Sequence, residues 1–244
     1  MRIPRIYVDL PLQESSVFDL PQASFQHVCK VLRLKNDYSL ILFNGQGGQY
    51  QAKLINVEKR SAQVEVLNYQ ALENESPIKV TLGQTLSRGE RMDYAIQKAV
   101  EAGVHRIQPL FSERCEVKLN TERLDKKIQH WQQIAISAAE QSGRGHVPEV
   151  LSPINLLDWT SNCKDMLKIT MHHHSAKPIS EMSEPEDKAV SVLIGPEGGL
   201  TESEVEASIQ HGFQPVALGS RVLRTETAPV VILTCINLLW GDIH

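Results

Sequence analysis

The sequence reads Leu-Ile-Gly-Pro-Glu-Gly-Gly-Leu over residues 193–200 and Leu-Gly-Ser-Arg-Val-Leu-Arg-Thr-Glu-Thr-Ala over residues 218–228. Each stretch follows a short apolar run that is typical of a buried strand, and each leads into a segment with helical features. Glycine lets a backbone approach a ligand closely, and the free N–H groups at a helix start can bind it. We therefore expect the two stretches to build one ligand-binding crevice at the ends of two strands.

The glycine-rich turn at 195–199 also has a purely structural interpretation. It lacks the Gly-Lys-Ser/Thr of a Walker loop and the spacing of the dinucleotide fingerprint. Taken alone, it is a tight turn before a helix whose capping box is Thr201 and Glu204.

The second loop can likewise be a salt-bridged connection, with Arg224 and Glu226 held by each other or by Glu197. Thr227 is expected to cap the last helix, with Pro229 in its first turn. That helix, from about Ala228 to Trp240, is apolar on nearly every side. A helix without a polar face must be covered all round, which predicts a homodimer through this part of the chain.

Residues 1–72 form a first module with a helix predicted over Ser24–Leu34 and several short strands, which favours a compact β-barrel. The segment Gln70–Pro77 is the candidate linker. From residue 73 to residue 244, strands alternate with helices, which predicts an α/β domain around a mostly parallel sheet. The expected strands and helices of this domain are Val80–Leu86, Glu90–Ala102, Arg106–Phe111, Thr121–Ser142, Met166–Met171, Ala189–Ile194 and Pro215–Leu218.

Charge and cysteine content limit the class of protein. The 244 residues carry a net charge of −4, yet residues 1–72 hold eight Lys/Arg against six Asp/Glu, so the first module is weakly basic. Four scattered cysteines without a Cys-x-x-Cys pair favour reduced thiols in a cytoplasm over disulfides or structural zinc. The chain has no apolar run of membrane-spanning length and no secretory signal at its start.

Together the two quoted stretches resemble the signature of the RsmE family, the ribosomal RNA small subunit methyltransferases E of the SPOUT class. The resemblance spans essentially the whole chain. Three further stretches match the family pattern: His27–Leu34, Gln97–Val104 and Glu140–Arg144.

The resemblance implies an N-terminal PUA-like β-barrel at 1–72 and a SPOUT-type α/β domain at 73–244, with a deep trefoil knot at about 193–239. It implies a homodimer that uses S-adenosylmethionine to methylate the N3 atom of a uridine in small-subunit (16S) ribosomal RNA. By the same resemblance, the cofactor lies against two loops and the ends of two strands. These cofactor-binding residues are Met171, His172, Ile194, Gly195, Gly199, Leu218, Gly219, Leu223, Arg224, Thr227 and Ala228.

Methylation of a uridine nitrogen requires that nitrogen to lose a proton. We expect Arg224 to stabilise the negative charge that develops on the uracil oxygens. Glu226 is a weaker candidate for accepting the proton, and a hydroxyl or a water could serve instead. For Arg224, a structural ion pair that shapes the loop remains the alternative.

The run His172-His173-His174 suggests a metal site at first sight. Adjacent residues on a strand point to opposite faces, so three in a row cannot easily bind one ion. We therefore predict no metal, and His173 and His174 have no assigned role.

Contact with RNA would depend on basic side chains acting together, because each alone is an ordinary solvated charge. The candidates are Arg2, Arg5, Lys30 and Arg33 in the first module and Arg88, Arg91 and Arg144 in the second.

Three other functions fit parts of the sequence. The same fold could methylate another RNA such as transfer RNA, or the chain could be a non-catalytic RNA-binding assembly factor. A nicotinamide-dependent enzyme is disfavoured by the missing dinucleotide fingerprint.

Overall fold

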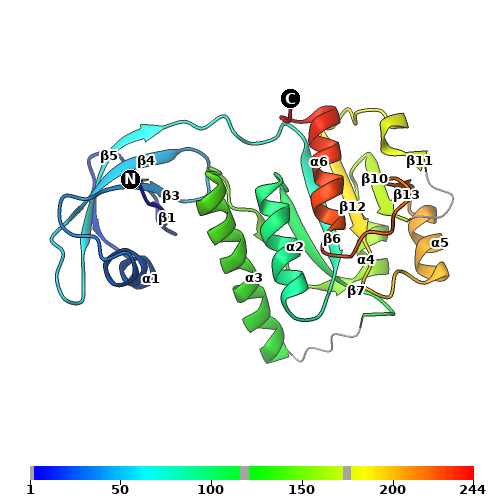
Figure 1. The fold of residues 1–244 in the computed structure, drawn as a ribbon, viewed down its shortest axis with the longest axis horizontal. Helices are drawn as coiled ribbons and strands as arrows, with labels where there is room; N and C mark the ends of the chain where they lie inside the picture. The colour runs from blue at the N-terminus through cyan, green and yellow to red at the C-terminus, as the bar shows by residue number, and fades with distance from the viewer. Residues whose placement is uncertain (1–2, 116–120, 173–176) are drawn as a thin grey trace. The chain divides into compact units, whose positions relative to one another are not determined.

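The computed structural model describes residues 3–115, 121–172 and 177–244, so Arg2, His173 and His174 lie outside the described residues. The chain divides into two compact units. The first comprises Met1–Glu75 together with Ala139–Val147, and the second comprises Ser76–Ala138 with Pro148–His244. Figure 1 colours the chain from its N-terminus to its C-terminus.

The first unit is built on a five-stranded sheet in the order β1-β3-β4-β5-β2. Strands β1 and β3 are parallel, and the other pairs are antiparallel. The core of this unit is formed by alternating apolar residues of the strands, such as Leu40, Leu42 and Leu54. Successive strand residues face opposite sides of the sheet, so every second residue points into the core. The strands are β1 (Arg5–Tyr7), β2 (Val17–Asp19), β3 (Ser39–Phe43), β4 (Gln49–Ile55) and β5 (Gln63–Gln70).

The helix predicted over Ser24–Leu34 is shorter and less regular than expected. An α-helical turn, α1 (Gln22–Phe25), passes directly into a π-helix, η1 (Gln26–Val31). The N–H of Leu32 donates to the carbonyl oxygen of His27 at 2.9 Å, which is the five-residue spacing of a π-turn. Arg33 then adopts a positive φ of 57°, which ends the helix.

The segment Ala139–Val147 belongs to the first unit through polar contacts that the sequence pattern does not indicate. The guanidinium of Arg5 donates to the carbonyl oxygens of Ala139 (2.9 Å) and Arg144 (2.6 Å) and lies over the Phe43 ring. The N–H of Tyr7 donates to Glu140 at 2.8 Å. These bonds give the guanidinium of Arg5 a structural role in this unit, and its contact with RNA stays a prediction.

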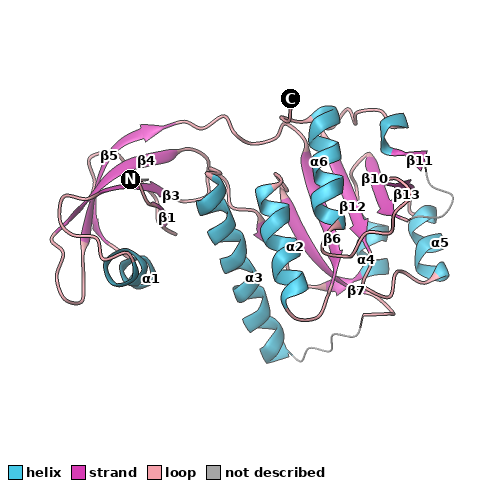
Figure 2. Cartoon of the chain, viewed as in Figure 1, coloured by secondary structure: helices cyan, strands magenta, loops and turns pink. Residues whose placement is uncertain are grey.

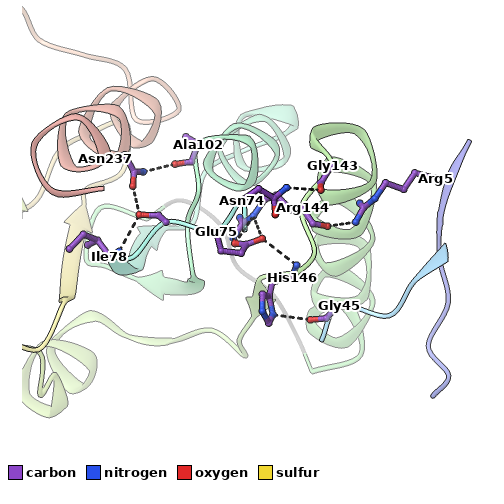
Figure 3. Close-up of polar contacts among 11 residues, drawn as sticks. Arg5, Gly45, Asn74, Glu75, Ile78, Ala102, Gly143, Arg144, His146 and Asn237 are labelled. Atoms are coloured by element: carbon purple, nitrogen blue, oxygen red, sulfur yellow. Dashed lines mark hydrogen bonds and ion pairs between the residues drawn. The ribbon is translucent and has the colours of Figure 1, made fainter. Parts of the chain in front are cut away.

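Arg144 is corrected from an RNA contact to a structural residue. It is 6% exposed and forms an ion pair with Glu75, whose carboxylate also accepts the N–H of His146 at 3.3 Å. Figure 3 shows this pair beside the bond from Asn74 to the carbonyl oxygen of Gly143. The pair therefore closes the first unit between residues that are far apart in the sequence.

The second unit contains a parallel sheet in the order β11-β13-β10-β12-β6-β7-β8, with β9 paired to β7. The predicted α/β architecture with a mostly parallel sheet is thus confirmed. The strands are β6 (Lys79–Thr85), β7 (Arg106–Phe111), β8 (Glu149–Val150), β9 (Ile154–Asn155), β10 (Leu167–Met171), β11 (Lys177–Pro178), β12 (Ala189–Ile194) and β13 (Gln214–Ala217).

Helices cover this sheet, and Figure 2 distinguishes them from the strands. Helices α2 and α6 pack against each other, as do α4 and α5. A cluster of Leu110, Trp159 and Phe213 with neighbouring apolar residues fills the space between α4 and the sheet. The helices are α2 (Glu90–Glu101), α3 (Thr121–Ser142), α4 (Leu156–Asn162), η2 (Ile179–Glu181), α5 (Glu202–Gln210) and α6 (Ala228–Trp240).

A buried asparagine fixes α6 to the end of α2. The side-chain amide of Asn237 donates to the carbonyl oxygen of Ala102 at 2.9 Å, and its oxygen accepts the hydroxyl of Ser76 at 2.5 Å (Figure 3). Asn237 is 1% exposed, so losing either partner would leave a buried polar group unpaired. This contact sets the position of α6 within the second unit.

Replacing Arg144 by Met should destabilise the first unit, because it leaves the Glu75 carboxylate without its buried cation. Breaking a buried pair on one side costs about 3–5 kcal/mol, and we expect a value near the lower limit because Glu75 keeps partial access to water. Hydrogen exchange of the slowest amides in the strands of this unit measures the loss. The matched control is Lys53→Met, which removes an exposed pair with Asp37 and should change stability little. Equal effects of the two substitutions would contradict this account.

Candidate functional site

A cavity of about 1040 Å³ opens at the carboxyl ends of β10, β12 and β13 in the second unit. Because these strands are parallel, Met171, Ile194 and Ala217 end at the same edge of the sheet. The glycine-rich turn and the 218–226 loop both line the cavity. The two quoted stretches therefore lie side by side, at the edge where ligands bind in open α/β sheets.

Most residues predicted to hold a cofactor lie on the wall of this cavity. Thr227 is the exception. It is the N-cap residue of α6, but its side chain makes no capping bond, so the expected side-chain cap is wrong, although Pro229 does lie in the first turn. The predicted residues that line the cavity are Met171, His172, Ile194, Gly195, Gly199, Leu218, Gly219, Leu223, Arg224 and Ala228.

Two buried hydrogen bonds join the loops to each other and to the sheet. The hydroxyl of Thr225 donates to the carbonyl oxygen of Gly195 at 2.7 Å. The side-chain amide of Gln84, at the end of β6, donates to the same hydroxyl at 3.0 Å. Gln84 and Thr225 are 1% and 7% exposed, so water does not compete for these bonds. We call this Gln84–Thr225–Gly195 arrangement the loop clasp.

The glycine-rich turn is held from outside by two arginines. Arg91 forms an ion pair with Glu197 at 2.8 Å, and Arg114 donates to the carbonyl oxygen of Gly198 at 2.9 Å. Burial alone would raise the pKa of Glu197. Its hydrogen bonds with backbone N–H groups and with Arg91 outweigh burial and lower that pKa below its ordinary value. Glu197 is thus an anionic partner of Arg91, and not of Arg224 as one structural alternative supposed.

Arg224 and Glu226 lie together at the cavity, but they are only loosely paired. Their closest nitrogen and oxygen atoms are 4.0 Å apart, and the Arg224 side chain is 81% exposed. The Glu226 side chain is 15% exposed, and its Oε2 atom is buried without a hydrogen-bond partner among the described residues. Arg224 is therefore able to reorient, whereas Glu226 offers a desolvated acceptor to a donor group on a bound molecule.

The cavity wall suits a ligand bound largely through backbone atoms. Gly199 and Gly219 adopt positive φ values of 69° and 80°, which L side chains rarely adopt. A Cβ added at Gly199 would project into open space, so the approach to the backbone is clear at that point. Apolar side chains such as Ile194, Leu218 and Leu223 supply the remaining surface.

The other basic residues predicted to contact RNA lie in both units. In the first unit, Lys30 donates to the carbonyl oxygen of Lys59 at 2.7 Å, and Arg33 is exposed just after the π-helix. In the second unit, Arg88 and Arg91 are exposed at the start of α2. Their contact with RNA stays a prediction.

Within residues 3–115, 121–172 and 177–244, no group of three His, Cys, Asp or Glu side chains could hold a metal ion. None of the helices in the same ranges combines the length and apolarity needed to cross a membrane.

The sequence pattern did not indicate that Gln84 or Arg114 belongs to the site. For Arg91 it predicted a contact with RNA but not the ion pair with Glu197. Gln84 had a usable signal, since it is a polar residue near the end of a predicted strand. The pairing of Arg91 with Glu197 had none, because the two residues are separated by 106 positions and meet only in the folded chain.

Comparisons with known proteins agree with this arrangement. Residues 74–237 match a family model described as an RNA methyltransferase domain, and residues 20–67 match an RNA methyltransferase PUA domain. The ribosomal RNA small subunit methyltransferase E of Buchnera aphidicola is 37% identical over 99% of this chain and 98% of its own.

Two solved structures match this chain over its full length and over their own full length. The ribosomal RNA small subunit methyltransferase E of Neisseria gonorrhoeae, bound to S-adenosylmethionine, is 40% identical with a TM-score of 0.94. A protein from Legionella pneumophila described as a methyltransferase in complex with the same cofactor is 37% identical with a TM-score of 0.96.

In the protein without ligand, replacing Thr225 by Val should make both loops more mobile. Valine keeps the shape of the threonine side chain but removes the hydroxyl that joins the two loops. Each buried bond lost costs about 1–3 kcal/mol, so amide hydrogen exchange in 195–200 and 219–227 should accelerate about 10- to 100-fold. Thr225→Ser retains the hydroxyl and is the matched control. Acceleration in only one loop, or equal effects of Val and Ser, would show that the clasp does not join them.

Proposed function

Because the chain belongs to the RsmE family of ribosomal RNA small subunit methyltransferases, we propose that it methylates the N3 atom of a uridine in 16S ribosomal RNA. Its methyl donor is S-adenosylmethionine. The observation that carries the proposal is the clasped pair of loops around one cavity at the carboxyl edge of the sheet. Membership in the family gives the reaction class, and the cavity supplies a place for its donor.

S-adenosylmethionine, when bound, supplies a methyl group activated by a sulfonium centre. Backbone N–H and C=O groups of the glycine-rich turn and the 218–226 loop would hold the donor, with Met171 and His172 on the neighbouring strand end. The apolar side chains would exclude water from it. The Oε2 atom of Glu226, which has no hydrogen-bond partner among the described residues, fits a ligand that carries hydrogen-bond donors.

The acceptor nitrogen must lose its proton before or during transfer. We assign stabilisation of the resulting uracil anion to Arg224, whose exposed guanidinium lies on the cavity wall and is weakly tied to Glu226. Glu226 is the candidate for receiving the proton, because its carboxylate lies beside Arg224 and has an oxygen without a partner among the described residues. Lys30 and Arg33 of the first unit are the candidates for contacts with RNA phosphates away from the reaction.

Two other functions are alternative outcomes of an assay that measures methyl transfer to RNA and the binding of RNA and S-adenosylmethionine. If the methylated nucleotide maps to transfer RNA, the fold and the chemistry hold but the substrate is different. If RNA binds while S-adenosylmethionine does not, the chain is an assembly factor with a silent donor cavity. Ribosomal RNA as the substrate would place the protein in the cytoplasm, which cell fractionation tests.

We also infer a trefoil knot at about 193–239. Strand β13 is separated from β12 by β10, yet the chain returns past Gly195 to reach α6, which packs against α2. Such a return across the carboxyl edge is needed for a knot, although connections in proteins are almost always unknotted. Stretching the unfolded chain from its two ends tests this inference: a tightened knot leaves the chain shorter than about 3.3–3.6 Å per residue allows.

We further propose a homodimer formed through α6. Leu238 and Leu239 are 61% and 42% exposed on a largely apolar helix, and Val231 and Cys235 lie two turns and one turn before Leu238 along the helix. Burying such a strip against a second copy would remove it from water. Sedimentation should give about twice the chain mass of 27.4 kDa, and a monomer at micromolar concentration would contradict the proposal.

Purified protein should transfer label from S-adenosylmethionine to small ribosomal subunits that lack the modification. Arg224→Ala should lower kcat about 100-fold or more with little change in donor affinity, because it removes a group that acts on the developing charge. Arg106→Ala is the matched control, because Arg106 is an exposed arginine at the amino end of β7 that lines neither cavity, and it should stay close to wild type. No transfer by the unaltered protein would refute the function, and parallel losses of kcat and donor affinity would make Arg224 a binding residue.

A further inference from the structure

We propose that a second cavity, beside the donor cavity, receives the base of the target nucleotide. This inference rests on the proposed function. The cavity measures about 910 Å³ and is formed by three segments of the second unit. These are the turn after β6 with the first residues of α2 (Arg88–Arg91), the residues after β7 (Glu113–Cys115) and the middle of the glycine-rich turn (Glu197 and Gly198).

The position of this cavity follows from the order of the strands. Strands β12, β6 and β7 are parallel neighbours, so the segments that follow them meet at the carboxyl edge of the sheet. The donor cavity lies at the same edge, beyond β12. A methyl acceptor must come within about 3–3.5 Å of the donor carbon, and a nucleotide at this edge would approach the donor from the adjoining side.

The two cavities share one wall, made of Arg91, Arg114, Glu197 and Gly198. The wall is fixed by the Arg91–Glu197 ion pair at 2.8 Å and by the bond from Arg114 to Gly198 at 2.9 Å. The backbone N–H of Arg88 also donates to Glu197 at 3.3 Å. Because these residues border both cavities, a base in the second cavity and a donor in the first are positioned by the same side chains.

The chemistry of the second cavity differs from that of the donor cavity. Its lining carries three arginines and three glutamates, with Cys115 and two glycines, and has no large apolar side chain. Guanidinium groups donate to carbonyl oxygens and stack on base planes, and carboxylates accept N–H and hydroxyl groups. The arginines of this set match the two carbonyl oxygens of a uracil, and N3 between those oxygens stays available to the donor.

The charge balance favours a base over a run of phosphates. Three cations and three carboxylates leave the lining without net charge, whereas a groove that follows the RNA backbone has an excess of cations. The nucleotide would have to leave its stack to enter, as in other enzymes that modify bases. We therefore assign phosphate contacts to other surfaces and base recognition to this cavity.

The test compares Arg88→Met with wild type on small ribosomal subunits that lack the modification. Arg88 lines only the second cavity, so its loss should raise KM for the subunit about 10- to 100-fold, the range expected for a hydrogen bond to a charged group. Donor affinity measured by calorimetry should stay within about twofold. Arg106→Met is the matched control, because Arg106 is an exposed arginine at the amino end of β7, and it should behave as wild type.

An unchanged KM in Arg88→Met, or a parallel loss of donor affinity, would overturn the inference. If wild type itself transfers no methyl group, the proposed function fails. If wild type methylates the subunit but Arg88→Met leaves its KM unchanged, only this inference fails.

Photo-crosslinking gives a readout that does not depend on catalysis. RNA with 4-thiouridine at the position that wild type methylates, incubated with S-adenosylhomocysteine, should crosslink to 88–91 or 113–115. Crosslinks confined to the 219–224 loop or to the first unit would overturn the inference.

Discussion

The site depends on one buried hydroxyl, that of Thr225, which accepts from Gln84 and donates to the carbonyl oxygen of Gly195. Gly195 and Thr225, which lie in the two loops that it joins, are 30 positions apart in the sequence. In a dry interior the two hydrogen bonds are strong, and their loss would leave polar groups unpaired. The cavity therefore keeps its shape because the Thr225 side chain joins its two loops and Gln84 of β6 holds that side chain in place.

In this arrangement the backbone lines the donor cavity, whereas the charged residues hold the glycine-rich turn or face the reacting group. Arg91 and Arg114 hold the glycine-rich turn from outside, where Glu197 and Gly198 also border the second cavity. Arg224 is exposed and only loosely paired, so it can respond to a charge that exists only during the reaction. The first unit uses its own buried pair, Arg144 with Glu75, to close around a segment that the sequence places far away.

The sequence predicted the parallel α/β domain well, because long alternating patterns of strands and helices reflect burial directly. It also placed the two glycine-bearing loops together, since parallel strands end at one edge. It could not predict that 139–147 joins the first unit, because Arg5, Glu75 and Arg144 pair through polar contacts that leave no periodic trace. For the same reason Arg5 and Arg144 were taken for surface charges. The π-helical turn at 26–31 was missed because its apolar spacing also fits an α-helix.

Hydrogen exchange with and without S-adenosylmethionine tests most directly whether the two loops form one donor site. The account predicts that backbone amides in 195–200 and in 218–228 gain protection together and at the same donor concentration, while amides of the first unit stay unchanged. Protection in only one of these segments, or in neither at concentrations that saturate binding, would contradict it.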